Sequence, residues 1–270
     1  MSDLSRLSFT TELAPGVESI DLGIAGVSVV TTTRVGGCSQ GAYQAFNLAT
    51  HVNDAAEAVI ANRTRLQQVI EPATEVLWLN QVHGSQVVSA EQAESGVTAD
   101  ASYTTKANKA CAILTADCLP VVIAAVDGSG VAVAHAGWRG LAGGVLEATL
   151  TALSEANGNL PTSSMRTWLG PCIGPTAFEV GAEVRTAFVQ SQGEQASACF
   201  TQVSVTEPQG HESTHYLGDL AGLAVQRLAN VGVEDVLVDG RCTLAHPETF
   251  FSYRRDGQTG RMVTLAWLNR

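Results

Sequence analysis

Three residues of this chain could together hold a metal ion: His83, Cys118 and His135. Two imidazole nitrogens and one thiolate form a three-ligand set that is typical of zinc sites with a fourth position left for water. Such a site is catalytic, because a structural zinc has its positions filled by protein. The residues lie 35 positions (83 to 118) and 17 positions (118 to 135) apart, which is not a zinc-finger spacing. The prediction therefore depends on how the fold brings them together.

Each of the three residues follows a predicted strand. Residues 75–79 form a short strand that delivers Gln81 and His83, and residues 110–116 form one that ends at Asp117 and Cys118. Asp-Gly-Ser-Gly at 127–130 predicts a hairpin that joins strand 120–126 to strand 131–135, which ends at His135. Sheets often collect their active sites at strand ends, so we expect the three side chains to converge.

The remaining pattern mixes helices and strands, which favours an α/β or α+β class with mixed sheets. We expect a layered single domain over residues 1–270, with helices flanking the sheets and residues 1–24 as an N-terminal extension or edge strand. Asn53 should cap a helix over 54–70, and residues 194–210 read as a polar, irregular loop. The other expected elements are strands at 27–33, 86–90, 166–169, 236–239 and 262–267 and helices at 141–156, 180–190 and 217–229.

Several residues near the three donors could take part in chemistry. Asp117 could orient a ligand histidine or act as an acid or base. Gly-Trp-Arg-Gly at 137–140 precedes a predicted helix, where Arg139 and backbone N–H groups could hold an anion. Arg34, in a glycine-rich loop with Ser39, is a second candidate for an anion site, whereas Arg63 on a helix reads more simply as a surface residue.

Two later segments also carry candidate residues. The stiff loop Gly-Pro-Cys-Ile-Gly-Pro at 170–175 could present Cys172 or its backbone amides to a pocket, and it reads equally well as a plain turn. Residues 250–255 place aromatic side chains beside Arg254 and Arg255, a combination that could stack a ring. An ordinary edge strand explains the same pattern.

A nucleophilic thiol is the main rival to a metal centre. Cys118 with His135 or His83 as base would resemble a thiol hydrolase, with Asp117 close in sequence. The two readings make opposite demands on the sulfur, because a metal-bound thiolate is poorly free to attack.

Composition excludes several classes of function. The chain has 270 residues and a net charge of −11, which disfavours binding to nucleic acid. No apolar run approaches the ~20 residues of a membrane span, and the N-terminus lacks the features of a signal peptide. Six cysteines are scattered singly, without a Cys-x-x-Cys pair, which fits a reducing compartment. We expect a cytoplasmic protein that is a monomer or a small homo-oligomer.

Five motifs resemble one known family in order and rough spacing. They are NQVHG at 80–84, TADCLPV at 115–121, HAGWRG at 135–140, GPCIG at 170–174 and FSYRR at 251–255. The chain is similar to the laccase-domain family, also called bacterial polyphenol-oxidase-like proteins or purine nucleoside phosphorylases. The resemblance extends over roughly residues 25–268 and includes TTRVGGCS at 32–39.

The resemblance implies a layered α/β fold and a zinc ion held by His83, Cys118 and His135. It also implies phosphorolysis of adenosine, inosine, guanosine and methylthioadenosine, together with deamination of adenosine. The substrates would be a purine nucleoside and phosphate, and the zinc would lower the pKa of a bound water to ~7. The catalytic candidates are His83, Asp117 and Cys118, and the candidates for binding substrate or phosphate are Arg34, Arg63, Gln81, Arg139, Cys172 and Arg254.

Two alternatives follow from the same family. Copper binds such ligands more tightly than zinc does, and a copper-loaded site would oxidise phenols. A true multicopper oxidase is disfavoured, because its sites use paired His-x-His motifs and none of the six histidines here forms one. Some relatives are described as editing peptidoglycan precursors, which would make the protein an amidase that uses the metal or Cys118.

Overall fold

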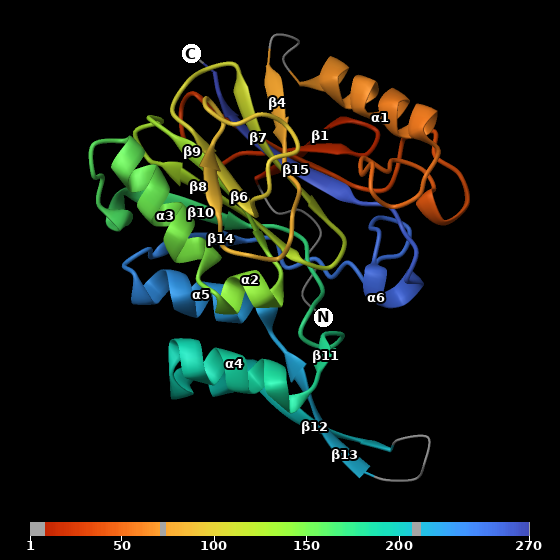
Figure 1. Cartoon of the computed structure of the whole chain (residues 1–270), viewed down its shortest axis with the longest axis vertical. Coiled ribbons are helices and arrows are strands. Elements are labelled where there is room, and N and C mark those ends of the chain that lie inside the picture. The colour runs from red at the N-terminus through yellow and green to blue at the C-terminus, as the bar shows by residue number, and fades with distance from the viewer. Residues whose placement is uncertain (1–8, 71–73, 207–211, 270) are drawn as a thin grey trace.

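A computed structural model describes residues 9–70, 74–206 and 212–269 of the chain. The fold consists of two six-stranded sheets and a smaller three-stranded sheet, with helices packed against them (Figure 1). This confirms the predicted mixed α/β class. The first eight residues, part of the expected N-terminal extension, lie outside the described residues. Within the described part, no helix is both long and apolar enough to cross a membrane.

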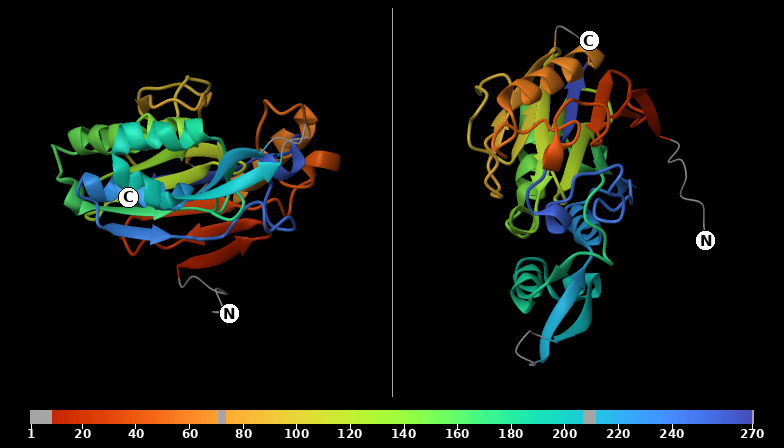
Figure 2. Two further views of the ribbon diagram at one scale, coloured as in Figure 1. Left: turned by 90° about the horizontal axis from the view of Figure 1, so that it is seen from below. Right: turned by 90° about the vertical axis from the view of Figure 1, so that its right-hand side faces the viewer.

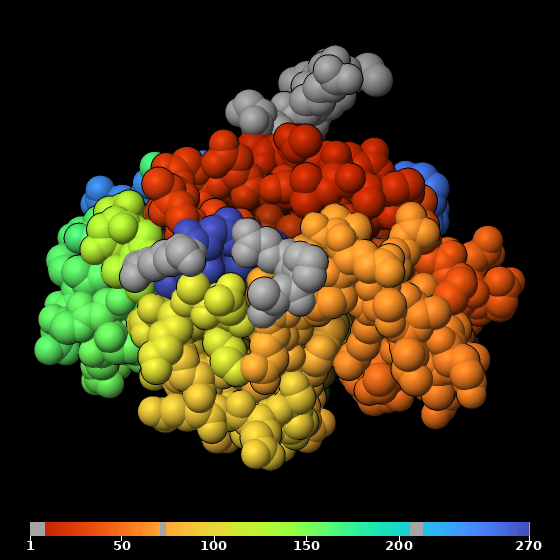
Figure 3. Space-filling view, turned by 90° about the horizontal axis from the view of Figure 1, so that it is seen from above, coloured from red at the N-terminus to blue at the C-terminus, as the bar shows by residue number. Residues whose placement is uncertain are grey.

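The first sheet has the order β1-β2-β3-β15-β7-β4 and mixes antiparallel pairs with one parallel pair, β4 with β7. β1 is its edge strand, and β15 lies between β3 and β7, as the blue atoms between the red and yellow ones show in Figure 3. The strands are β1 (Thr10–Ala14), β2 (Val17–Ile20), β3 (Val27–Thr32), β15 (Met262–Leu268), β7 (Lys109–Thr115) and β4 (Glu75–Trp78).

The second sheet has the order β14-β10-β8-β9-β6-β5. Its centre is the predicted hairpin, in which β8 and β9 pair antiparallel. The strands are β14 (Asp235–Val238), β10 (Met165–Leu169), β8 (Leu119–Ala125), β9 (Val131–Ala136), β6 (Ala101–Thr104) and β5 (Val87–Ser89).

The alternation of side chains along the strands builds the layers. Cys111 and Ile113 of β7 face the second sheet, where they share a buried core with Val133 of β9 and Trp168 of β10. The intervening residues Ala110, Ala112 and Leu114 face the other way and pack with α1 (Ala56–Val69). The far side of the second sheet is covered by α3 (Val145–Ala156) and α5 (Leu220–Asn230).

A smaller unit extends from this body. It contains β11 (Glu179–Val180), β12 (Phe200–Thr206), β13 (Glu212–Gly218) and α4 (Ala182–Gln192). It lies below the two large sheets in Figure 1 and in the right-hand view of Figure 2. The irregular loop predicted for 194–210 is wrong in its described part, which contains the 3-10 helix Glu194–Cys199 and β12. Val203 and Val205 alternate with polar residues there, and β12 pairs with β13 along its whole length.

Two helix predictions near the site also need correction. The helix expected to begin near Leu141 begins at Trp138 and is divided into α2 (Trp138–Ala142) and α3. The division falls at Gly144, whose φ of 87° is left-handed. Asn53 does not cap α1; it has a φ of 63°, and Ala55 is the N-cap without a side-chain hydrogen bond. Of the two interpretations of residues 250–255, the edge strand is wrong, because Tyr253–Asp256 is the short helix α6.

Candidate active site

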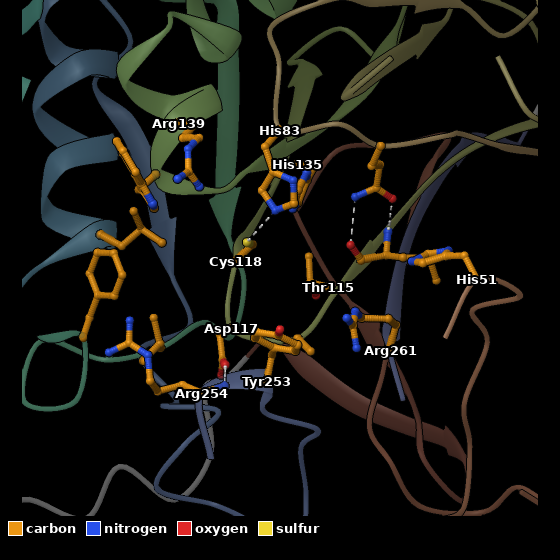
Figure 4. Close-up of a pocket in the computed structure, with 17 residues that line it drawn as sticks. His51, His83, Thr115, Asp117, Cys118, His135, Arg139, Tyr253, Arg254 and Arg261 are labelled. Atoms are coloured by element: carbon orange, nitrogen blue, oxygen red, sulfur yellow. Dashed lines mark hydrogen bonds between the residues drawn. The ribbon is translucent and has the colours of Figure 1, made fainter. Parts of the chain in front are cut away.

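His83, Cys118 and His135 meet at one place, and each comes from the end of a different strand segment. One ligand atom from each residue lies within 4.8 Å of the other two, and Cys118 Sγ is 3.8 Å from His83 Nε2. The two imidazole rings are nearly perpendicular, with centroids 4.7 Å apart. Figure 4 shows both rings and the sulfur directed toward a common point. These separations suit a metal bonded to nitrogen at ~2.0 Å and to sulfur at ~2.3 Å.

Asp100 fixes the positions of both histidines, a role that was not predicted from the sequence. Its buried carboxylate accepts a hydrogen bond of 2.8 Å from His135 Nδ1, which leaves Nε2 of that ring for a metal. It also accepts hydrogen bonds from the backbone N–H groups of Val82, His83 and Gly84. These bonds hold the turn in which His83 adopts a φ of 61°. The only sequence signal was a lone acid between apolar residues, just before β6.

Asp117 does not orient a ligand histidine, which was one of its two predicted roles. Its carboxylate accepts hydrogen bonds from the Thr243 hydroxyl (2.6 Å) and from the backbone N–H of Arg254 (2.7 Å). Its own φ of 84° forms the turn that presents Cys118. Asp100 is the residue that orients a histidine, while Asp117 lines the pocket and joins the Cys118 turn to α6.

The electrostatics of the cluster favour a thiolate. Burial alone would raise the pKa of Cys118, but the charges and hydrogen bonds of His135 and His83 lower it to about 6. The pKa of His135 is raised to about 9 even though burial would lower it, because the Cys118 thiolate and Asp100 stabilise the charged imidazolium. A thiolate is the form in which cysteine binds a metal, so the environment already prepares Cys118 for this role.

Gly137 leaves the space that the three donors need. A Cβ atom at this position would lie 2.8 Å from His83 Cδ2 and 3.0 Å from Cys118 Sγ. Gly140 similarly lets α2 approach the His83 turn, because a Cβ there would be 2.7 Å from the Gly84 carbonyl oxygen. The two glycines of the 137–140 motif thus provide the space in which the three donors and the His83 turn meet.

The donors open into a pocket of about 560 Å³. One wall is apolar and aromatic, with Trp138, Ile173, Phe178 and Leu220, and Arg139 and Arg254 lie over its rings. The opposite side holds His51, Thr115 and Arg261 (Figure 4). The sequence had suggested no role for His51 or Arg261, whereas Tyr253 belongs to the segment 250–255 that could stack a ring.

The remaining predicted residues divide into two groups. Gln81, Arg139 and Arg254 line the pocket, although the Gln81 amide is already engaged with the backbone N–H and C=O of Leu114. Arg34 and Arg63 do not line it.

Arg34 donates to the carbonyl oxygens of Gln44 and Pro247, and Arg63 donates to that of Leu48 while it stacks on Trp78. Cys172 is buried behind the pocket, and burial raises the pKa of its thiol.

Comparisons with known proteins agree with this geometry. The profile of the family described as multi-copper polyphenol oxidoreductase laccase matches residues 28–269. A protein of Escherichia coli K12 named purine nucleoside phosphorylase YfiH is 45% identical over 244 residues, which cover 90% of this chain and 94% of that protein. A Mycobacterium tuberculosis protein named purine nucleoside phosphorylase is 36% identical over 97% of this chain and 99% of its own length.

Two crystal structures share the fold. A Neisseria meningitidis protein aligns with a TM-score of 0.85 and 44% identity, over 94% of this chain and 100% of its own. YlmD from Geobacillus stearothermophilus aligns with a TM-score of 0.84 and 28% identity, over 97% and 99%. The chain belongs to the multi-copper polyphenol oxidoreductase laccase family, as its five motifs predicted.

Proposed function

We propose that this protein is a metal-dependent purine nucleoside phosphorylase. The observation that carries the proposal is the His83–Cys118–His135 donor set, which opens into a pocket with one aromatic wall and one cationic wall. A pocket of about 560 Å³ is in the range that takes a small ligand. The names of the relatives from Escherichia coli and Mycobacterium tuberculosis support the same activity.

The reaction needs few covalent steps from the protein. A phosphate oxygen forms a bond to C1′ of the ribose while the C1′–N9 bond breaks. The electron pair of the C1′–N9 bond leaves with the purine, which takes up a proton. The products are ribose 1-phosphate and the free base. Positioning and charge supply most of the catalysis in such a transfer.

The donor set fits a resident zinc ion. The three ligand atoms lie within 4.8 Å of one another, Asp100 directs one His135 nitrogen toward them, and the thiol favours its ionised form. When bound, zinc supplies a Lewis acid and lowers the pKa of a coordinated water to ~7. Copper is the alternative, since imidazole and thiolate ligands suit it as well.

We assign the pocket residues the following roles. Trp138 and Phe178 hold the flat purine ring, and Arg139 and Arg254 bind its polar edge or the ribose. Asp117 accepts a proton from the substrate or a water, and Gln81 holds the strand end beside Leu114. Adenosine, inosine, guanosine and methylthioadenosine are the expected substrates. Deamination of adenosine, in which water replaces the exocyclic amine and ammonia leaves, is the expected second activity of the same centre.

A thiol-dependent amidase is the second candidate, because Cys118 and His135 favour a thiolate–imidazolium pair. This reading needs a sulfur that is free of metal. It therefore predicts that added zinc inhibits the enzyme, whereas the phosphorylase reading predicts that zinc restores activity to a stripped enzyme.

The test is to incubate the purified protein with each nucleoside, with and without phosphate. We expect ribose 1-phosphate only when phosphate is present, and inosine from adenosine even without it. Cys118→Ala should abolish both activities, while Cys199→Ala, which changes a cysteine outside the pocket, should leave them intact. Absence of ribose 1-phosphate with adenosine, inosine and guanosine, and of 5-methylthioribose 1-phosphate with methylthioadenosine, in the metal-loaded enzyme would refute the proposal.

A further inference from the structure

We propose that His51 and Arg261 form an oxyanion subsite that holds the inorganic phosphate of the reaction. Both residues line the pocket, and Figure 4 shows them on the side of Cys118 that lies away from Arg139 and Arg254. The identity of the anion as the second substrate rests on the proposed function; the presence of an anion site does not. This subsite replaces Arg34 and Arg63, which lie outside the pocket, as the place for phosphate.

Arg261 is fixed in position with donors to spare. Its Nη1 donates to the carbonyl oxygens of Thr259 (2.8 Å) and Gly260 (3.0 Å). Among the residues that the structure describes, its Nε and Nη2 have no hydrogen-bond acceptor, and the guanidinium has no carboxylate within ion-pair distance. A guanidinium forked in this way binds two oxygens of one phosphate well.

The surroundings of Arg261 favour an anion. Burial lowers the pKa of Arg261 by more than the charges of Cys118 and Asp117 raise it, so this cation has lost part of its hydration. Arg241, another partly buried arginine, instead forms ion pairs with Asp239 and Glu18. A partly desolvated cation without such a partner gains from a small anion that enters the pocket.

His51 lies in the same positive field. Its pKa is lowered first by burial and then by the charges of Arg261 and Arg63. An anion at this place would offset both charges, and the imidazole of His51 can donate one N–H group to it whether or not the ring is protonated. Arg63 lies outside the pocket, and its charge adds to the positive potential at His51 while its Nε donates to the Leu48 carbonyl oxygen.

A buried network holds the two residues side by side. The backbone N–H of Arg261 donates to Asn47 Oδ1 (3.0 Å), and its carbonyl accepts from the Leu48 N–H (3.3 Å). Asn62 on α1 donates to the Asn47 carbonyl (2.9 Å). The loop that carries His51 is thereby fixed to the start of β15, so the subsite is preformed.

Inorganic phosphate fits this place better than the other parts of the substrate do. The opposite wall of Trp138, Ile173, Phe178 and Leu220 is apolar and suits a purine ring. A nucleoside that stacks on that wall leaves the opposite side, which holds His51 and Arg261, free for the attacking phosphate. A long polyanion is disfavoured by the net charge of −11.

The experiment measures two quantities on the metal-loaded enzyme: the dissociation constant of inorganic phosphate by titration calorimetry, and the KM values for phosphate and inosine. The variants are Arg261→Gln and His51→Gln. The side chain of His51 forms no hydrogen bond with the residues that the structure describes, so His51→Gln should fold even if Arg261→Gln does not. The matched control is Arg65→Gln, which removes an exposed charge from α1. We expect both pocket variants to weaken phosphate binding and raise its KM by about tenfold or more, with KM for inosine within about twofold.

The outcomes separate the subsite from the proposed function. Unchanged phosphate affinity and phosphate KM in both folded variants would overturn the subsite and leave the phosphorylase intact. If the wild type forms no ribose 1-phosphate, the proposed function fails, and the calorimetric titration still decides whether His51 and Arg261 form an anion site. Phosphate binding that weakens in the two variants and not in Arg65→Gln supports an anion site, and a wild type that binds no phosphate overturns it.

Discussion

Asp100 Oδ1 and His135 Nδ1 are 2.8 Å apart, and both side chains are buried. Burial would raise the pKa of Asp100, but hydrogen bonds from His135 and from the N–H groups of Gly84 and Val82 keep it below its usual value. The lowered pKa means that the carboxylate stabilises the folded protein above about pH 4 and that this stabilisation is lost as the pH falls further. One buried acid thus orients two of the three metal donors.

Asp100→Asn should lower zinc affinity by about 10- to 100-fold, because it removes the charge that orients His135 and supports the His83 turn. Competition with a chromophoric chelator measures the change. Glu91→Gln is the control: Glu91 also accepts hydrogen bonds from backbone N–H groups, at Thr105 and Lys106, but lies outside the pocket. Equal zinc affinity in Asp100→Asn and wild type would contradict the role given to Asp100.

Gly137→Ala should abolish metal binding while the protein remains folded. Its φ of −63° is open to alanine, so the effect comes from the new methyl group 2.8 Å from His83 Cδ2 and 3.0 Å from Cys118 Sγ. Metal content and circular dichroism of the purified variant test this. Gly84→Ala, whose nearest contact would be an ordinary 3.4 Å, should keep its metal. A fully loaded Gly137→Ala protein would show that the donors lie elsewhere.

In metal-stripped protein, Cys118 should react with iodoacetamide at a rate that rises through about pH 6 and is nearly constant above pH ~7, because its lowered pKa keeps the thiolate above that value. Cys111 and Cys172 should stay unmodified, since burial raises the pKa of both thiols. Peptide mass mapping separates the three sites. Zinc should protect Cys118, and reactivity that begins only near pH 9 would contradict the coupling to His135.

Asn62→Ala should lower the free energy of unfolding by about 3 kcal/mol, because several buried partners lose their hydrogen bonds. Asn62 Nδ2 donates to Ser39 Oγ and to the carbonyl oxygens of Ala45 and Asn47, and its Oδ1 accepts from the Cys38 N–H. Urea denaturation measures the loss. The exposed Asn80, whose side chain bonds only to Thr98 among the side chains that the structure describes, provides a control: Asn80→Ala should cost less than about 1 kcal/mol.

The sequence predicted the elements that combine an apolar run with a clear turn signal. The β8–β9 hairpin, β7 and the strand ends that carry His83, Cys118 and His135 follow from apolar runs beside turn residues, and the family motifs located the same donors. The polar β12 was missed because its strand character depends on pairing with β13. The break between α2 and α3 depends on the left-handed Gly144.

The rest of the site could not be predicted because it depends on contacts between distant segments. Asp100 stands 35 positions from His135, and Thr243 stands 126 positions from Asp117, so neither partner is visible in a local pattern. Arg34 and Arg63 were plausible anion ligands by residue type, and only the fold engages them with backbone carbonyls. Arg261 joins the pocket because β15 begins beside the loop of Asn47.

The central claim is that one metal ion is held by His83, Cys118 and His135. Anomalous diffraction from crystals of protein purified without added metal, recorded on both sides of the zinc and copper absorption edges, tests it directly. We expect a single peak bonded to both imidazoles and the sulfur, with a difference across the zinc edge. A peak at any other position, or none at this centre in crystals soaked with zinc, would contradict the account.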